Sequence, residues 1–252
     1  MSAIIDGFDV RSLAVTFRHG AEIGRHEHSW GQLVFAKHGV MRVTTDDAAW
    51  LVPATRAIWL PAGLAHGISM RGEVAMRTLY LAPTRGAALS RGASALEVSP
   101  LLRELILHIL KLGMLAPARP EHDRLAGLLI DLLASAPPEP LFLPLPRDLR
   151  ARHLAEYVQV HPESGHDLAR LAREAGASPR TLQRLFPRET GLTLEAWRQR
   201  ARLIHAAARL SAGASVTDAA LDCGYQSLGA FIAAFRRQFG VTPGRYGTPK
   251  PA

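Results

Sequence analysis

The chain has 252 residues, which is long enough for two domains with ordinary hydrophobic cores. It contains 30 basic and 22 acidic residues, a net charge of +8, and a single cysteine, Cys223. One cysteine excludes a disulfide framework within the chain and a zinc site built from several cysteines. The first 18 residues lack the apolar core of a signal peptide, and the most apolar run, residues 101–116, contains charged side chains. We therefore expect a cytoplasmic protein with no segment that enters a membrane.

The positive charge is concentrated in the last part of the chain. Residues 147–252 contain 16 basic and 9 acidic residues, a net charge of +7, whereas residues 1–146 contain 14 and 13. A basic segment joined to a nearly neutral one is typical of a phosphate-binding module that is coupled to a sensing or assembly module. A basic surface that only contacts solvent would give the same charge, so the charge by itself leaves both interpretations open.

Short β-rich runs dominate residues 14–81. Turn-forming pairs such as His38-Gly39 and Asp46-Asp47 separate them. The clearest runs are residues 32–36, 40–45, 48–52, 57–60 and 74–82. Several short strands at this spacing predict a small antiparallel barrel in the N-terminal part of the chain.

Histidines in this β-rich region have the spacing of a known motif. His26 and His28 are two residues apart in a predicted strand, so their side chains point to the same face. The residues that match the spacing of the first cupin motif are Gly20, His26, His28, Gln32 and Gly39. The residues that match the second cupin motif are Pro61, Gly63 and His66. The first hundred residues therefore resemble a cupin barrel, although Gln32 stands where that motif has a glutamate.

This resemblance implies a site for a divalent transition metal such as zinc, nickel or iron, with an open coordination position. His26, His28 and His66 would be its ligands, and Gln32 would be a weaker, neutral ligand. A metal-free effector pocket formed by the same histidines is the alternative. The tryptophans that are candidates to line this pocket are Trp30, Trp50 and Trp59. Single tryptophans in barrels also commonly belong to the core, so this alternative stays open for them.

A helical pattern begins at Ser99, which is a good helix cap, and continues to about residue 134. Its apolar positions form two stripes at helical spacing, which are Leu101, Leu102, Leu105, Ile106, Ile109, Leu110 and Leu112, and then Leu125, Leu128, Leu129, Leu132 and Leu133. These helices either pack on the barrel or form a subunit interface. Residues 136–146 contain five prolines and are expected to be a linker. We thus expect a sensing barrel at 1–98, a helical dimerisation segment and linker at 99–146, and a separate basic domain at 147–252.

One helical pattern occurs twice after residue 147. Residues 167–175 and 216–223 are expected to be short supporting helices, each followed by a glycine turn and a second helix. Five pairs of matching residues are 49 positions apart, namely Ser178 with Ser227, Leu182 with Phe231, Phe186 with Phe235, Gly191 with Gly240 and Thr193 with Thr242. Two such copies predict two helix-turn-helix units, an arrangement that reads DNA. Residues 147–252 are therefore expected to be a DNA-binding domain.

The two units differ in the side chains that they offer to DNA. In the first unit, the expected contact residues are Arg180, Thr181, Gln183, Arg184 and Arg188. Arginine can bind guanine and glutamine can bind adenine, so Arg180, Gln183 and Arg184 are the expected base readers, and Arg188 is expected on a phosphate. In the second unit, the expected contact residues are Gln226, Ser227, Ala230, Arg236 and Arg237. We expect weaker or methyl-directed reading there, with the two arginines on the DNA backbone.

Residues 193–210 are expected to form one amphipathic helix between the two units. Eighteen helical residues span about 27 Å, so this helix can separate the recognition helices by roughly one turn of DNA, about 34 Å. One protomer would then read two successive segments of the major groove.

The last hundred residues, including the closing GYQSLGAFIAAFRRQFGVTPGRY, resemble the AraC/XylS family of bacterial transcription regulators. This resemblance implies an α+β multidomain protein that binds double-stranded promoter DNA, commonly as a homodimer and an activator, and responds to a small molecule or metal in its N-terminal barrel. The alternative is a metal-dependent cupin enzyme, an oxygenase or isomerase, fused to a DNA-binding domain. We do not expect an enzyme, because Glu27 alternates to the other face and position 32 is an amide, which leaves no carboxylate for acid/base chemistry.

Overall fold

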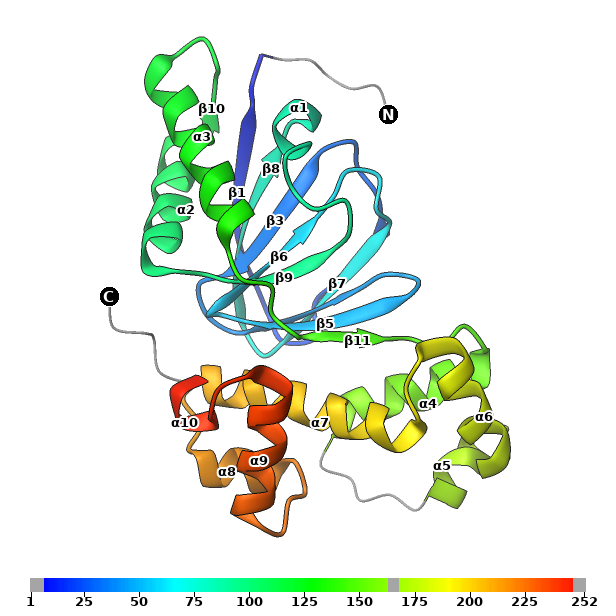
Figure 1. The fold of residues 1–252 in the computed structure, drawn as a ribbon. Helices are drawn as coiled ribbons and strands as arrows, with labels where there is room; N and C mark the ends of the chain where they lie inside the picture. The colour runs from blue at the N-terminus through cyan, green and yellow to red at the C-terminus, as the bar shows by residue number, and fades with distance from the viewer. Residues whose placement is uncertain (1–6, 163–167, 247–252) are drawn as a thin grey trace. The chain divides into compact units, whose positions relative to one another are not determined.

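The computed structural model describes residues 7–162 and 168–246 and divides the chain into two compact units (Figure 1). Unit 1 contains the described residues up to 45 together with residues 52–139. Unit 2 contains residues 46–51 and the described residues from 140 onward. Asp167, the expected first residue of a supporting helix, lies outside the described residues. Within the described part of the chain, no helix has the length and apolar character needed to cross a bilayer.

The β-rich region forms two antiparallel sheets, which confirms the α+β prediction. The first sheet has the strand order β10-β1-β8-β3-β6-β9 and the second has the order β11-β5-β4-β7-β2. The strands are β1 (Val10–Phe17), β2 (Glu22–His26), β3 (Gly31–Ala36), β4 (Val40–Thr44), β5 (Ala48–Pro53), β6 (Arg56–Leu60), β7 (His66–Arg71), β8 (Val74–Leu81), β9 (Ser94–Glu97), β10 (Met114–Leu115) and β11 (Phe142–Pro144). Each of the two sheets has two edge strands. The region that was expected to be a barrel therefore consists of two separate sheets and not of one closed sheet.

Strand register assigns the two faces of the first sheet. In the pairing of β3 with β8, Gln32 lies opposite Tyr80, and Leu33 lies opposite Leu79. Residues that lie opposite each other share a face, and the next residue along a strand points to the other face. Gln32 and Tyr80 are therefore on one face, and Leu33 and Leu79 are on the other.

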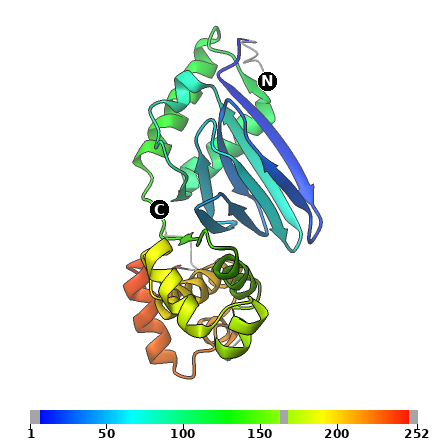
Figure 2. The same ribbon diagram turned by 90° about the vertical axis from the view of Figure 1, so that its right-hand side faces the viewer.

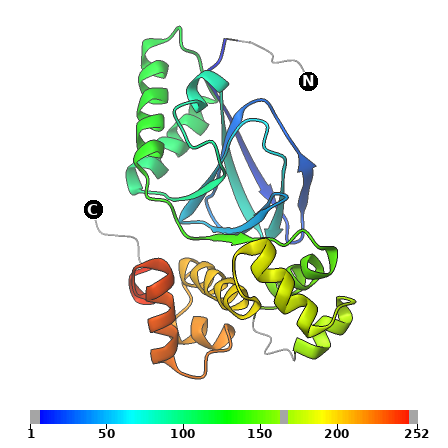
Figure 3. The ribbon, with the colours of Figure 1, turned by 45° about the vertical axis from the view of Figure 1, so that its right-hand side comes forward.

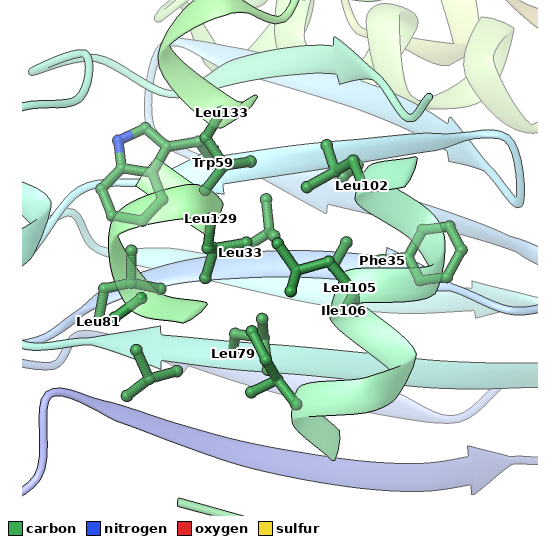
Figure 4. Close-up of a cluster of buried hydrophobic side chains, with 14 of the residues drawn as sticks. Leu33, Phe35, Trp59, Leu79, Leu81, Leu102, Leu105, Ile106, Leu129 and Leu133 are labelled. Carbon is green, nitrogen blue, oxygen red and sulfur yellow. The ribbon is translucent and has the colours of Figure 1, made fainter. Parts of the chain in front are cut away.

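Helices α2 (Pro100–Leu112) and α3 (Pro120–Ser135) pack on the leucine face of the first sheet (Figure 2). Figure 4 shows this core, in which Leu102, Leu105, Ile106, Leu129 and Leu133 of the helices contact Leu33, Phe35, Trp59, Leu79 and Leu81 of the strands. The Ser99 side chain caps α2 by accepting a hydrogen bond from Leu102 N. Of the two alternatives left open for these helices, packing on the sheet is observed. A short helix, α1 (Pro83–Gly86), precedes β9.

Unit 2 consists mainly of helices, with α7 in contact with helices on both sides of it (Figure 3). They are α4 (Leu149–Val160), α5 (Leu168–Glu174), α6 (Pro179–Thr190), α7 (Leu194–Ser211), α8 (Val216–Asp222), α9 (Leu228–Phe239) and α10 (Pro243–Tyr246). The pairs α5–α6 and α8–α9 are the two helix-turn-helix units, and α7 has the predicted 18 residues. The expected linker, residues 136–146, contains β11, which pairs with β5 through Phe142 and Trp50.

Candidate DNA-reading helices and a histidine cluster

The first helix-turn-helix unit combines a glycine turn with a capped recognition helix. Gly176 adopts a φ of 67°, a conformation that favours glycine and lets α5 turn sharply into α6. Ser178 caps α6 by accepting a hydrogen bond from Thr181 N at 3.1 Å. Leu182 and Phe186 are fully buried, so these two positions fix which face of α6 points inward.

The outward face of α6 is polar and available for contacts. Arg180, Gln183 and Arg184 are exposed, and none of their side chains forms a hydrogen bond or ion pair within the described part of the chain. Thr181 is half-buried and its hydroxyl lies 2.9 Å from that of Ser178. Arg188 is exposed and pairs with Glu189 at 2.7 Å. The structure therefore brings the three expected base readers together on one face, with Arg188 at the far end of the helix.

The second unit has the same frame and a different surface. Gly224 adopts a φ of 72°, and Ser227 caps α9 by accepting from Ala230 N at 3.4 Å. Phe231 and Phe235 are fully buried. The exposed residues of this turn and helix are Gly224, Gln226, Ser227, Leu228, Gly229, Ala230, Ala233, Arg236 and Arg237. The amino-terminal part of α9 thus offers methyl groups, and the only exposed charges of the helix lie in its last turn.

Gly229 is not required by the packing of α9. A Cβ added there would meet only the Ser227 hydroxyl, at 3.8 Å, and the φ angle of Gly229 is not positive. Glycine inside a helix costs roughly 0.5–1 kcal/mol relative to alanine. The position leaves space for another molecule to approach the helix backbone.

Helix α7 is anchored at its amino-terminal end by an indole. Trp197 is fully buried, and its ring centroid lies 5.3 Å from that of Phe186 in α6. Its Nε1 donates a hydrogen bond to Pro144 O at 2.6 Å. Further along α7, Ala206 and Ala207 are fully buried, which allows close packing between helices. These contacts hold α7 in a fixed position within unit 2.

Three histidines converge in unit 1. His26 ends β2, His28 follows it, and His66 begins β7, where its backbone lies opposite that of His26. One ring nitrogen from each lies within 4.8 Å of the others. His66 is fully buried, whereas His26 and His28 are half-buried. Solvent can therefore reach the cluster from the side of His26 and His28.

Each imidazole is held by a backbone carbonyl through Nδ1. The distances are 2.8 Å from His26 to Gly24 O, 2.6 Å from His28 to Trp30 O, and 2.7 Å from His66 to Leu64 O. Such contacts fix the proton on Nδ1 and leave the Nε2 lone pair free to bind a metal.

Gln32 presents its amide oxygen to two of these Nε2 atoms. The amide nitrogen donates to the Thr78 hydroxyl at 3.0 Å and to the Tyr80 hydroxyl at 3.1 Å. Because the Thr78 hydroxyl donates to Leu33 O, it must accept from Gln32, and this fixes the orientation of the amide. Oε1 of Gln32 then lies 3.0 Å from Nε2 of His28 and 3.1 Å from Nε2 of His66.

The cluster therefore has more acceptors than protons. A neutral imidazole has one N–H, yet the rings of His28 and His66 each face an acceptor oxygen at both nitrogens. Burial, together with the nearby His26 and His28 rings, lowers the pKa of His66 to about 4, which disfavours a second proton at neutral pH. A cation bound to the Nε2 atoms removes the conflict, and imidazole nitrogens bind zinc at about 2.0–2.1 Å. The donor set fits a transition metal.

Of the three candidate tryptophans, Trp30 contacts the cluster, through its carbonyl oxygen. Trp59 belongs to the core beneath α2 and α3, donates to Ser90 O, and lies so close to Gly31 that a Cβ there would be 2.1 Å from its ring. It points to the face opposite Gln32, because it lies opposite Leu33. Trp50 belongs to unit 2, where its ring packs against Phe142 at 5.6 Å.

Two residues that support the cluster were missed by the sequence analysis. Thr78 and Tyr80 hold the Gln32 amide, and the Tyr80 ring meets His28 edge-on at a centroid distance of 5.3 Å. Both lie in a predicted strand and are two residues apart, so the sequence indicates that they share a face. It does not indicate that this face meets Gln32, because that depends on strand register.

Comparisons with known proteins agree with this organisation. Residues 14–186 match the AraC-like ligand binding domain, and residues 171–248 match a helix-turn-helix domain. The HTH-type transcriptional regulator NimR of Escherichia coli (strain K12) is 35% identical over 221 residues, which are 88% of this chain and 81% of NimR. The HTH-type transcriptional regulator ExsA of Pseudomonas aeruginosa is 28% identical over 228 residues, 85% of this chain and 76% of ExsA.

Among solved structures, ToxT from Vibrio cholerae O395 matches 95% of this chain and 97% of its own, with a TM-score of 0.41 and 10% identity. The ligand-binding-domain match covers well over half of the chain, and NimR is similar over most of its own length. This chain therefore belongs to the AraC family of DNA-binding transcription regulators.

Proposed function

We propose that this regulator reads duplex promoter DNA mainly through α6 and senses a divalent transition metal through His26, His28, His66 and Gln32. The observation that supports metal sensing is the convergence of one ring nitrogen from each of three histidines with one amide oxygen, in a domain of the AraC-like ligand binding type. Zinc, nickel and iron are the candidates, because imidazole suits all three.

The DNA half of the proposal rests on the exposed, unpaired polar face of α6. Arg180 and Arg184 are suited to guanine and Gln183 to adenine in the major groove. Arg188, Arg236 and Arg237 would contact phosphates, and the methyl groups near the start of α9 would contact thymine methyl groups. Helix α7 would hold the two recognition helices at a fixed separation, since it packs on both helix-turn-helix units.

We also propose that the protein works as a homodimer. Leu101 and Leu112 of α2 and Leu128 of α3 remain exposed although their neighbours pack on the sheet. Symmetric dimers commonly bury such helix faces. A metal that changes how unit 1 is ordered would then act on DNA by shifting the population of dimers that can bind two sites.

We favour sensing over catalysis for the histidine cluster. The relatives are transcription regulators, and the cluster formed by the described residues combines imidazoles and an amide without a carboxylate. An oxygen-consumption assay on the iron-loaded protein tests this choice, because turnover of a substrate would favour the cupin-oxygenase alternative.

Calorimetric titration of the metal-free chain with Zn²⁺ or Ni²⁺ tests the metal site. We expect one equivalent to bind. His66→Ala and His28→Ala should each weaken binding by about 10- to 100-fold, because each removes one ligand together with the hydrogen bond that orients it. His108→Ala is the matched control, because His108 is exposed on α2. Equal losses for all three variants, or no binding by the unaltered chain, would refute the metal half of the proposal.

A further inference from the structure

We propose that the effector of this regulator is a small carboxylate that binds the open position of the metal held by His26, His28 and His66. This inference rests on the proposed metal site and adds to it the chemical class of the second ligand. It follows from the charge of the ligand set, from the polar groups around that set, and from its exposure.

The ligand set carries no negative charge. The candidate ligands are three imidazoles and the Gln32 amide, and no carboxylate has a ligand atom in the cluster formed by the described residues. A divalent metal would keep both positive charges there. His66 is fully buried and Gln32 is nearly so, and an uncompensated charge in such surroundings is costly. An anion that binds the metal removes this cost, and a carboxylate oxygen is a common ligand of these metals.

The side of the cluster that solvent can reach contains a hydrogen-bond donor, the Tyr80 hydroxyl. The Tyr80 hydroxyl accepts from the Gln32 amide, and its own hydrogen is not donated to any group among the described residues. The Tyr80 ring lies edge-on to His28, one of the two half-buried histidines. Tyr80 can therefore donate to an oxygen of a ligand that enters from the solvent side.

Arg11 carries a positive charge in addition to that of the metal, and it lies on β1, the strand that pairs with β8. Arg11 lies directly opposite Tyr80 in the pairing of β1 with β8, so both side chains are on the same face. The Arg11 guanidinium lies 4.3 Å from the ring centroid of Trp30, whose carbonyl oxygen holds His28. The surroundings of the cluster thus favour an anion over a neutral molecule of the same shape.

The test uses the full chain loaded with one equivalent of Ni²⁺, titrated with glycolate and with its neutral counterpart glycolamide. Calorimetry measures binding, and the visible absorption of Ni²⁺ reports whether its coordination changes. We expect glycolate to bind only to the loaded protein and to shift the spectrum, and glycolamide to bind at least roughly tenfold more weakly because it carries no charge.

Three substitutions separate the contributions. Gln32→Glu supplies an internal carboxylate, so it should strengthen Ni²⁺ binding and weaken glycolate binding by roughly tenfold or more. Measured on protein saturated with Ni²⁺, Tyr80→Phe should weaken glycolate binding by about 3- to 10-fold, the usual effect of losing one hydrogen bond. Arg11→Met should also weaken glycolate, whereas Arg18→Met, which removes an exposed arginine just after β1, should not.

The outcomes distinguish this inference from the proposed function. If Ni²⁺ binds and glycolate and glycolamide then bind equally well, or neither binds, the carboxylate inference is overturned while the metal site stands. If Gln32→Glu leaves glycolate binding unchanged, the charge argument is refuted as well. If Ni²⁺ does not bind the unaltered chain, the metal site and the inference fall together. Circular dichroism of each variant confirms that the comparison is made between folded proteins.

Discussion

The two helix-turn-helix units share a core and differ in the surface that faces outward. Phe186 of α6 and Phe235 of α9 are both fully buried, 49 residues apart in sequence. Both recognition helices end at a glycine with nearly the same positive φ, 72° at Gly191 and 73° at Gly240. The frame of the first unit is repeated in the second, with one additional residue in the turn between Gly224 and Ser227.

The outward positions are repeated less faithfully, although the exposed Arg188 and Arg237 do match. The matching positions on α6 and α9 are Arg180 with Gly229, Thr181 with Ala230, and Arg184 with Ala233. At each of them α6 carries a hydrogen-bonding side chain and α9 carries a methyl group or a hydrogen atom. The comparison teaches that folding requirements fix the buried residues of both units, whereas the hydrogen-bonding side chains of the outward faces are distributed unequally between them. Mutations can test first the shared core of the two units and then the outward faces of α6 and α9.

The shared core predicts equal costs for equal truncations. Phe186→Ala and Phe235→Ala should each lower the free energy of unfolding by about 3–5 kcal/mol, because each leaves a cavity in a fully buried site. Urea unfolding followed by circular dichroism measures both values. Leu228→Ala is the control, because Leu228 is 46% exposed and its truncation should cost much less. A difference of more than about 2 kcal/mol between the two phenylalanine variants would show that the cores are not equivalent.

The different surfaces predict unequal costs in DNA binding. Arg184→Ala makes α6 resemble α9 at this position, and we expect specific binding to weaken by about 1–3 kcal/mol, or roughly 5- to 150-fold. Fluorescence anisotropy on an operator selected by the full chain from random duplexes, and on a scrambled duplex, measures the loss and the drop in specificity. Arg119→Ala removes the same charge from an exposed site in unit 1 and should change neither value. If the scrambled duplex lost as much affinity as the operator, Arg184 would be a phosphate contact.

The methyl groups of α9 predict a smaller and chemically distinct effect. Replacing thymine by deoxyuridine removes one methyl group from the DNA and leaves every hydrogen-bonding group in place. We expect each such replacement in the half-site of α9 to weaken binding by up to about 0.8 kcal/mol, the value of one buried methylene-sized group. The half-site of α6 is identified by its sensitivity to Arg184→Ala, and deoxyuridine should have less effect there. Equal effects in both half-sites would remove the distinction between the two helices.

The helix-turn-helix frame could be predicted from the sequence because its signals are local. Ser178 and Ser227 mark the helix starts, Gly176 and Gly224 mark the turns, and each signal lies within a few residues of the structure that it determines. The grouping of the histidines was also predictable, since the motif spacing places His66 with His26 and His28.

The contacts that tune the histidine cluster could not be predicted in the same way. The pairing of Gln32 with Tyr80 joins residues 48 positions apart, and a shift of one residue in register would turn Tyr80 to the opposite face. The division of the strands into two sheets depends likewise on which edges pair. Strand β7 was missed because its inward residues include His66, and so its pattern is not a simple alternation of apolar and polar residues.

The two turns also allow a comparison between the units. Cys223 and Ala175 occupy matching positions directly before Gly224 and Gly176, and both are buried. The Cys223 thiol donates a hydrogen bond to Arg202 O at 3.1 Å, and burial, aided by Asp222, raises its pKa to about 12. The thiolate is the reactive form, so the folded protein should resist iodoacetamide at mildly alkaline pH and react only when it is unfolded in guanidinium chloride.

Replacing the thiol should be tolerated for the same structural reason. Cys223→Ala gives the second turn the residue that the first turn already has, so we expect it to lower the free energy of unfolding by about 1 kcal/mol, the usual net value of one hydrogen bond. DNA binding should not change, because Cys223 is fully buried and cannot contact DNA. Rapid alkylation of the folded protein would mean that the second turn opens in the native state. The two units would then differ in their frames as well as in their surfaces.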